Sequence, residues 1–194
     1  MKKILVAYAT NAGSTVEVAQ AIGEELGKAG NQVEVRPIKD VASVEQYDAV
    51  VVGAPMIMGW HASAVNFVKK NQRTLSKLRI AYFLTAMSLT QDSSPKSREI
   101  PVSIDPRLAK PPKNPGKLSF REGYAAIDNY LSSLLKASAQ IKPVSVGFFG
   151  GKLDLMRLKL WQKLFVMLVV QAQPGDYRNW PFIREWAGGL SAIL

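Results

Sequence analysis

Small polar side chains gather in one short stretch near the start of the chain. Thr10, Asn11, Ser14 and Thr15 lie between an apolar run at 4–8 and the beginning of a helical pattern. A turn that leads from a buried strand into a helix presents backbone N–H groups and the positive end of the helix dipole, and hydroxyl and amide groups add further donors. The stretch therefore indicates a phosphate-binding turn. The alternative is that these residues only cap the helix.

Other residue types limit the chemistry of this 194-residue chain. It contains no cysteine and one histidine, His61. These counts exclude thiol catalysis and iron–sulfur clusters and argue against a multi-histidine metal site, so we predict no metal. The turn has neither the G-x-G-x-x-G fingerprint of dinucleotide-binding proteins nor the lysine of a nucleotide-hydrolysing loop.

The chain is strongly basic, with a formal net charge of +10. Such a balance is typical of proteins that bind nucleic acid, an anionic membrane face or an anionic substrate. The motifs of nucleic-acid-binding modules are missing, so we expect no nucleic-acid partner. No signal peptide is recognisable, and no stretch reaches the roughly 18–20 apolar residues that span a bilayer. We expect a cytoplasmic protein.

Apolar runs and helical patterns alternate along the chain. Strands are expected at 2–8, 33–38, 47–53, 78–84 and 143–150, helices at 14–29, 62–75, 120–139 and from 180 onward, and a short helical turn at 40–46. The alternation predicts one α/β domain over 1–194, with a parallel sheet and helices on both faces. The loops after the first, third and fourth strands should converge at the carboxyl ends of the strands, where ligands bind.

Two segments interrupt this alternation. Residues 89–118 are basic and hold more than half of the 11 prolines, so we expect an insertion loop that either covers a ligand or is solvated. Residues 152–174 contain an apolar stretch at 153–170, interspersed with Arg157, Lys159 and Lys163. We expect an extra helix there that docks on a membrane surface, in a homodimer or on the domain's own sheet.

The polar turn and the loops around it resemble those of flavodoxins. In flavodoxins the first loop has the form Ser/Thr-x-Thr-Gly-x-Thr and binds the phosphate of flavin mononucleotide (FMN); this chain has Thr10-Asn11-Ala12-Gly13-Ser14-Thr15. Ala12 stands where a threonine is usual, so one hydroxyl contact is missing and weaker FMN binding is expected. The resemblance implies a flavodoxin-like five-stranded sheet in the order 2-1-3-4-5.

By the same resemblance, the loops after the third and fourth strands flank the flavin ring. Trp60 would either stack on the ring or pack within the domain, and His61 is a candidate proton donor. No catalytic residue is assigned, because a flavin carries the redox chemistry itself. The expected cofactor-binding residues are Thr10, Asn11, Ala12, Gly13, Ser14, Thr15, Pro55, Met56, Ile57, Met58, Gly59, Trp60, Thr85, Ala86, Met87 and Ser88.

A closer resemblance covers most of the chain. Gly53-Ala54, Gly150-Gly151-Lys152-Leu153-Asp154 and Gly175-Asp176-Tyr177-Arg178-Asn179-Trp180 are similar to segments of the flavodoxin-domain family that includes menaquinone-dependent protoporphyrinogen dehydrogenase. The similarity implies an FMN-dependent oxidoreductase that oxidises protoporphyrinogen or a related substrate and passes electrons to a quinone at the inner membrane face. A flavodoxin-type electron carrier, an NAD(P)H:quinone reductase and a module without flavin remain alternatives.

Overall fold

The centre of the protein is a parallel β-sheet. The computed structural model describes residues 1–57, 59–91, 100–114, 116–154 and 173–194. Within these ranges the strands follow the order β2-β1-β3-β4-β8-β6. The first five positions confirm the predicted flavodoxin-like order. The strand bounds are β1 Lys3–Tyr8, β2 Gln32–Pro37, β3 Ala49–Pro55, β4 Arg79–Ala86, β6 Val102–Ile104 and β8 Ser145–Gly150.

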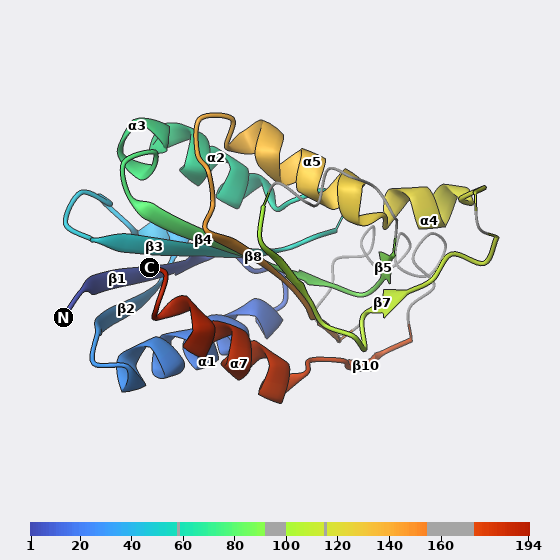
Figure 1. Cartoon of the computed structure of the whole chain (residues 1–194), viewed down its shortest axis with the longest axis horizontal. Coiled ribbons are helices and arrows are strands. Elements are labelled where there is room, and N and C mark those ends of the chain that lie inside the picture. Colours follow the sequence, from blue (N-terminus) through green and yellow to red (C-terminus); the bar gives the residue numbers. More distant parts are fainter. Residues whose placement is uncertain (58, 92–99, 115, 155–172) are drawn as a thin grey trace.

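Helices cover both faces of the sheet, as the alternation predicts (Figure 1). One face carries α1 (Ser14–Lys28) and α7 (Trp180–Leu190); the other carries α2 (Ala62–Lys70), α3 (Gln72–Leu75) and α5 (Ile127–Ala137). Every residue of β3 is buried. This strand lies between two apolar layers, and for that reason its sequence is a continuous apolar run rather than an alternating one.

The expected insertion loop at 89–118 contains short strands. β5 (Leu89–Thr90) pairs in parallel with β7 (Ala109–Lys110), and β6 pairs in parallel with β8. The expectation of a plain loop was therefore wrong for these residues. Each strand has only two or three residues, too few for a periodic pattern to be recognised.

Other boundaries also differ from the sequence prediction. The helix expected at 120–139 is divided into α4 (Phe120–Tyr124) and α5, and the helix expected at 62–75 into α2 and α3. The short helical turn expected at 40–46 is not formed; a 3-10 turn, η1 (Ile38–Asp40), comes before it, and 41–46 are not helical. Helix ends depend on local hydrogen bonds that a hydrophobic pattern does not report.

The segment between β8 and α7 contains the two strands of a short ribbon. β9 (Lys152–Leu153) pairs antiparallel with β10 (Gly175–Asp176). The apolar helix expected at 153–170 lies almost wholly outside the described residues. Among the residues that are described, no helix is long and apolar enough to cross a bilayer.

Candidate functional site

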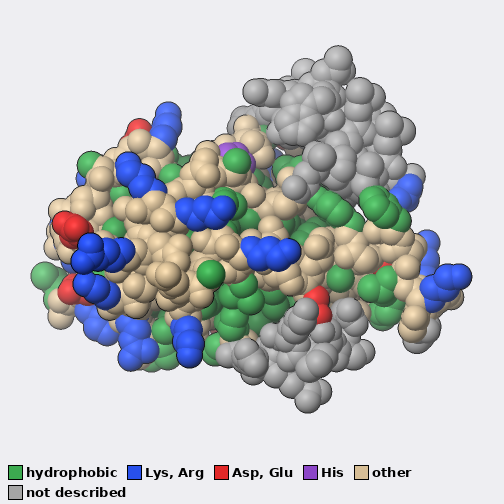
Figure 2. All heavy atoms as spheres, turned by 90° about the horizontal axis from the view of Figure 1, so that it is seen from above, with side chains coloured by type: hydrophobic (Ala, Val, Ile, Leu, Met, Phe, Trp, Pro, Cys, Tyr) green, Lys and Arg blue, Asp and Glu red, His purple; other side chains and the backbone are tan. Residues whose placement is uncertain are grey.

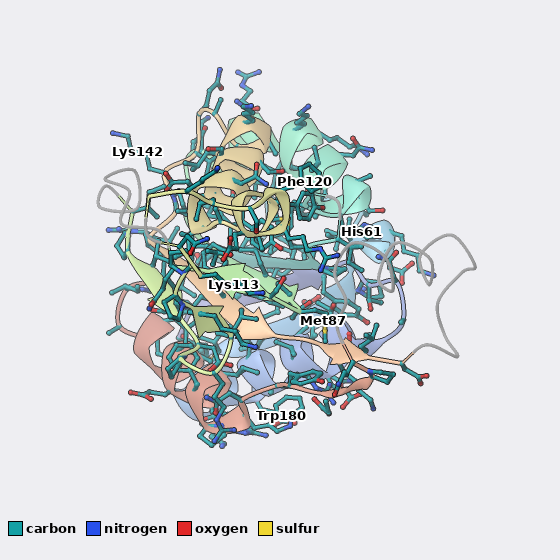
Figure 3. The ribbon with its side chains drawn as sticks, turned by 90° about the vertical axis from the view of Figure 1, so that its right-hand side faces the viewer. His61, Met87, Lys113, Phe120, Lys142 and Trp180 are labelled. Atoms are coloured by element: carbon teal, nitrogen blue, oxygen red, sulfur yellow. The ribbon has the colours of Figure 1, made fainter. Side chains whose placement is uncertain are left out.

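A cleft opens at the carboxyl ends of the strands, where the loops after β1, β3 and β4 meet. Figure 3 faces this end of the molecule, with Met87 near its middle and His61 to one side. The cleft holds about 870 Å³ of empty space, including the part open to solvent. Its lining is Asn11, Ala12, Ser14, Thr15, Pro55, Met56, Ile57, Thr85, Ala86, Met87, Ser88, Arg121, Tyr124, Tyr130, Gly151, Lys152 and Leu153.

The polar turn at 10–15 forms one end of the cleft. Gly13 adopts a left-handed backbone with φ of +89°, which favours glycine, and its N–H donates to Thr10 Oγ1 at 2.9 Å. Helix α1 begins directly afterwards, without a side-chain cap. In the part of the chain that the structure describes, no acceptor is found for the N–H groups of Ser14 and Thr15. This end of the cleft therefore offers backbone donors at the positive end of a helix dipole.

A pair of buried threonines connects the turn to the sheet. Thr15 is fully buried, and its Oγ1 lies 3.3 Å from Oγ1 of Thr85 at the end of β4. The two hydroxyls share this hydrogen bond although they are 70 residues apart in sequence. The contact fixes the start of α1 relative to the floor of the cleft.

His61 connects the loop after β3 to the same turn. Its Nδ1 accepts the N–H of Ser63 at 3.2 Å, which caps helix α2, so the ring hydrogen lies on Nε2. Nε2 is 3.1 Å from Oδ1 of Asn11 and donates to it. The amide nitrogen of Asn11 then remains available to a ligand. Burial lowers the pKa of His61, which favours this neutral form.

The structure brings together 11 of the expected cofactor-binding residues. They are Asn11, Ala12, Ser14, Thr15, Pro55, Met56, Ile57, Thr85, Ala86, Met87 and Ser88. Thr10 and Gly13 shape the turn but do not line the cleft. Met58 lies outside the described residues.

Trp60 and Gly59 do not line the cleft either. Trp60 is buried, and its ring meets Tyr82 edge-on with centroids 5.5 Å apart. Of the two roles left open by the sequence, this geometry favours packing within the domain over stacking on a ligand. Gly59 has φ of +106° and accepts the N–H of Ile57, so it serves the turn after β3.

Sequence reasoning missed two parts of the cleft lining, namely Gly151, Lys152 and Leu153 after β8 and a wall from α4 and α5. Arg121, Tyr124 and Tyr130 come from α4 and α5, and the rings of the two tyrosines meet edge-on at 6.5 Å. The hydroxyl of Tyr130 donates to the carbonyl of Ser88 at 3.4 Å, and burial raises its pKa. The hydrophobic pattern of the helix expected at 120–139 assigns both tyrosines to its packed face. A tyrosine on such a face also carries a polar hydroxyl, and this was the feature from which a ligand site could have been suspected.

Arg178 ties the chain after β10 to the start of α1. Its side chain is 3% exposed and binds Asp176, Glu17 at 3.0 Å and the carbonyl of Ser14 at 3.3 Å. The hydrogen bonds from Arg178 lower the pKa of the Asp176 carboxyl. The segment 175–180 therefore holds the start of α1, which forms the polar end of the cleft, in place.

Solved structures of flavodoxins resemble the chain weakly. A flavodoxin from Streptococcus pneumoniae is 13% identical over 99% of both chains, with a TM-score of 0.47. A flavodoxin variant from Fusobacterium nucleatum, solved with bound flavin mononucleotide, is 15% identical over 75% of this chain and 68% of its own, with a TM-score of 0.41. Flavodoxin 2 from Bacillus cereus is 23% identical over 44% of this chain, with a TM-score of 0.39, and the match spans only 62% of its length.

The family assignment rests on the sequence model of the flavodoxin domain, which matches residues 5–178. Comparison with curated proteins finds no match. FMN, the cofactor that the resemblance implied, is the cofactor of flavodoxin domains. The chain belongs to the flavodoxin domain family.

Proposed function

We propose that the protein binds FMN in the cleft and acts as an oxidoreductase on a small molecule. The observation that carries this proposal is that one cleft joins a donor-rich polar end to a largely apolar remainder. FMN has the matching division into a phosphate and an apolar ring. When bound, the flavin supplies the ability to accept and deliver two electrons.

The donor set at the polar end fits a phosphate. Ser14 and Thr15 line the cleft, and their N–H groups have no acceptor among the described residues; the Ser14 hydroxyl and the Asn11 amide nitrogen add donors. Helix α1 has 15 residues, long enough for a full dipole at its N-terminus. A phosphate can be held in this way without a lysine or arginine in the turn. Ala12 contributes no hydroxyl, so we expect weaker binding than in a turn with threonine at this position.

The remainder of the cleft fits a planar apolar ring. Met56 and Ile57 come from the loop after β3, Met87 from the loop after β4, and Tyr124 from α4. Thioether and aliphatic side chains adapt to an aromatic ligand and exclude water from its faces. In this proposal these residues bind and orient the ring, and none of them carries a proton in the reaction.

Positive charge around the cleft fits an anionic cofactor and substrate. Arg121 and Lys152 are among its lining residues. Figure 2 presents one face of the molecule, on which Lys and Arg side chains clearly outnumber Asp and Glu. Electron carriers of the flavodoxin type are usually acidic, so the net charge of +10 supports an enzyme over a carrier.

We further propose protoporphyrinogen or a related reduced molecule as electron donor and a quinone as acceptor. The support is the resemblance of segments 150–154 and 175–180 to the family that includes menaquinone-dependent protoporphyrinogen dehydrogenase. These segments meet in the fold, because the N–H of Tyr177 donates to the carbonyl of Gly151 at 3.0 Å. Peripheral membrane contact through 153–170, or homodimer formation through it, belongs to the same proposal.

Titration of the apoprotein with FMN tests the cofactor. Quenching of flavin fluorescence should saturate at one FMN per chain, and riboflavin, which lacks the phosphate, should bind at least about tenfold more weakly. Ser14→Ala should reduce this difference, because it removes a donor at the phosphate end. Absence of FMN binding would refute the proposed function.

A donor screen tests the reaction. The FMN-loaded protein is mixed without oxygen with protoporphyrinogen or with NADPH, and bleaching of the flavin absorbance is followed; menadione is then added as acceptor. Bleaching by protoporphyrinogen alone, reversed by menadione, supports the proposal. Bleaching by NADPH alone would instead favour an NAD(P)H:quinone reductase.

Co-sedimentation with vesicles tests the membrane contact. Binding to anionic vesicles that is lost on deletion of 155–170, which keeps β9 and the cleft residue Leu153, with FMN binding retained, supports this segment as the contact. Unchanged co-sedimentation would refute it.

A further inference from the structure

A second cavity lies beside the cleft that we propose to bind FMN, called the flavin cleft below. The two share Met87 and Ser88, which form the wall between them. The second cavity encloses about 1200 Å³ of empty space, counting the part open to solvent. Its other side is built by Arg107 and Lys110 from the insertion and by Tyr177 beyond β10. Nothing in the FMN proposal uses this cavity.

The charges around the second cavity do not cancel. Two of its lining residues, Arg178 and Asp176, neutralise each other through a two-point ion pair, and Arg178 also binds Glu17. Arg107 and Lys110 are both exposed, and within the described ranges neither has a carboxylate at ion-pair distance. The cavity therefore carries two positive charges that no acidic side chain of the described residues balances.

The backbone that carries these two cations is firmly held. The N–H of Arg107 donates to Oδ1 of Asp105 at 2.9 Å, and this fully buried carboxylate also accepts from Asn179 at 3.0 Å. Lys110 lies in β7, where its carbonyl accepts the N–H of Gln91 at 2.9 Å. Between the two cations, Leu108 is buried. The backbone of the insertion is thus held by hydrogen bonds at both Arg107 and Lys110, and it is not a solvated loop at these residues.

The walls of the second cavity also offer apolar surface. The ring of Tyr177 is held by a hydrogen bond from its hydroxyl to the carbonyl of Gln173 at 3.2 Å, yet the residue is 45% exposed. Met87 continues the apolar surface into the flavin cleft. A ligand with a planar apolar body and an anionic group at one end would match this arrangement.

We propose that the second cavity binds an anionic redox molecule, with its carboxylate held by Arg107 and Lys110 and its apolar body directed past Met87 toward the flavin. The redox role of this ligand rests on the proposed function, because it requires FMN in the neighbouring cleft. Binding of the ligand in the second cavity does not require FMN. The phosphate of FMN has a separate place, because the turn at 10–15 lines the first cleft and not the second.

Calorimetry with a matched pair of probes tests this assignment. The FMN-loaded protein and the apoprotein are each titrated with anthraquinone-2-carboxylate and with the uncharged anthraquinone-2-carboxamide. The carboxylate should bind more tightly to both forms, and less so as salt is added. The double substitution Arg107→Gln with Lys110→Gln should weaken its binding about tenfold and leave the carboxamide unchanged.

A second double substitution supplies the control. Lys113→Gln with Lys117→Gln removes the same charge from the same basic segment, at residues that do not line the cavity. Carboxylate binding should then stay within about twofold of the starting protein. Equal loss in both double variants would overturn the proposal, since it would indicate a general effect of net charge.

FMN titration of the same variants separates this proposal from the first. Unchanged FMN affinity in the Arg107 and Lys110 variant supports an independent anion site, whereas lost FMN affinity would assign the two cations to the cofactor and overturn it. If the unsubstituted protein binds no FMN, the proposed function fails. The probe result on the apoprotein still decides whether the anion site exists.

Discussion

The imidazole of His61 donates from Nε2 to Oδ1 of Asn11 across 3.1 Å. This contact joins the loop after β3, which lies along the proposed ring pocket, to the turn that would hold the phosphate. The same ring accepts a backbone N–H at the start of α2 through Nδ1. One neutral side chain therefore orients two parts of the candidate site at once, although it is not among the residues that line the cleft.

The first prediction concerns this bridge. Asparagine is a good N-cap but is too short to reach Asn11, so His61→Asn keeps the cap of α2 and removes the bridge. FMN should bind about three- to tenfold more weakly, while riboflavin should lose less affinity, because the lost hydrogen bond is made to the turn that would hold the phosphate. Fluorescence titration measures both. An equal loss for riboflavin would contradict a role at the phosphate.

The second prediction concerns pH. Because the pKa of His61 is lowered in the folded protein, its contribution to stability is complete above the ordinary value near 6.5. It is lost as pH falls below 6.5 toward the folded pKa, since the unfolded chain then binds the proton more strongly. Urea unfolding of the apoprotein at pH 7.5 and 5.5 measures this loss.

His61 is the chain's one histidine, so the assignment is direct. His61→Asn should lose less stability than the unsubstituted protein over the same pH interval. Proton NMR of the ring C–H groups should place the pKa in the folded protein below that in urea. The same pKa in both states would refute the argument.

The third prediction concerns Ala12, where flavodoxins usually have a threonine. Ala12 lines the cleft, so Ala12→Thr places a hydroxyl beside the proposed phosphate. One added hydrogen bond should tighten FMN binding by about three- to tenfold. Ala12→Val adds a similar volume without the hydroxyl and should give no gain. Similar affinities for the two variants would place the phosphate elsewhere.

The fourth prediction concerns the close contact behind the site. A Cβ at Gly150 would collide with the backbone carbonyl oxygen of Tyr177, and neither backbone can easily move. Gly150→Ala should therefore lower the free energy of unfolding by about 2 kcal/mol or more. Gly188→Ala, on the exposed side of α7 with open space around it, should instead raise it by about 0.5–1 kcal/mol. Urea unfolding compares the two.

The strands of the sheet were predictable because each is long enough to have a pattern. β3 and β4 are continuous apolar runs, and alternation with helices orders them. The loops that follow them could be placed in one cleft for the same reason. Eleven of the expected residues line it, because parallel strands bring their carboxyl ends to the same edge.

The insertion and its contacts could not be predicted in this way. β6 is a strand only because β8 supplies its hydrogen-bonding partner, and those residues lie more than 40 positions later in the chain. Trp60 illustrates the same limit: its place against Tyr82 depends on the path of the loop after β3, which residue types alone do not determine. The wall from α4 and α5 was missed because tyrosine suits both a core and a ligand site.

The short strand β6 also has a consequence for solubility. It covers the outer side of β8, whose sequence Ser-Val-Gly-Phe-Phe-Gly would otherwise present an open row of backbone groups flanked by large apolar side chains. β6 itself offers only three residues and is followed closely by Pro106, a poor template for another chain. The insertion therefore protects the sheet from edge-to-edge association. Trimming residues 89–118 to a minimal flavodoxin-like core should yield a protein that aggregates.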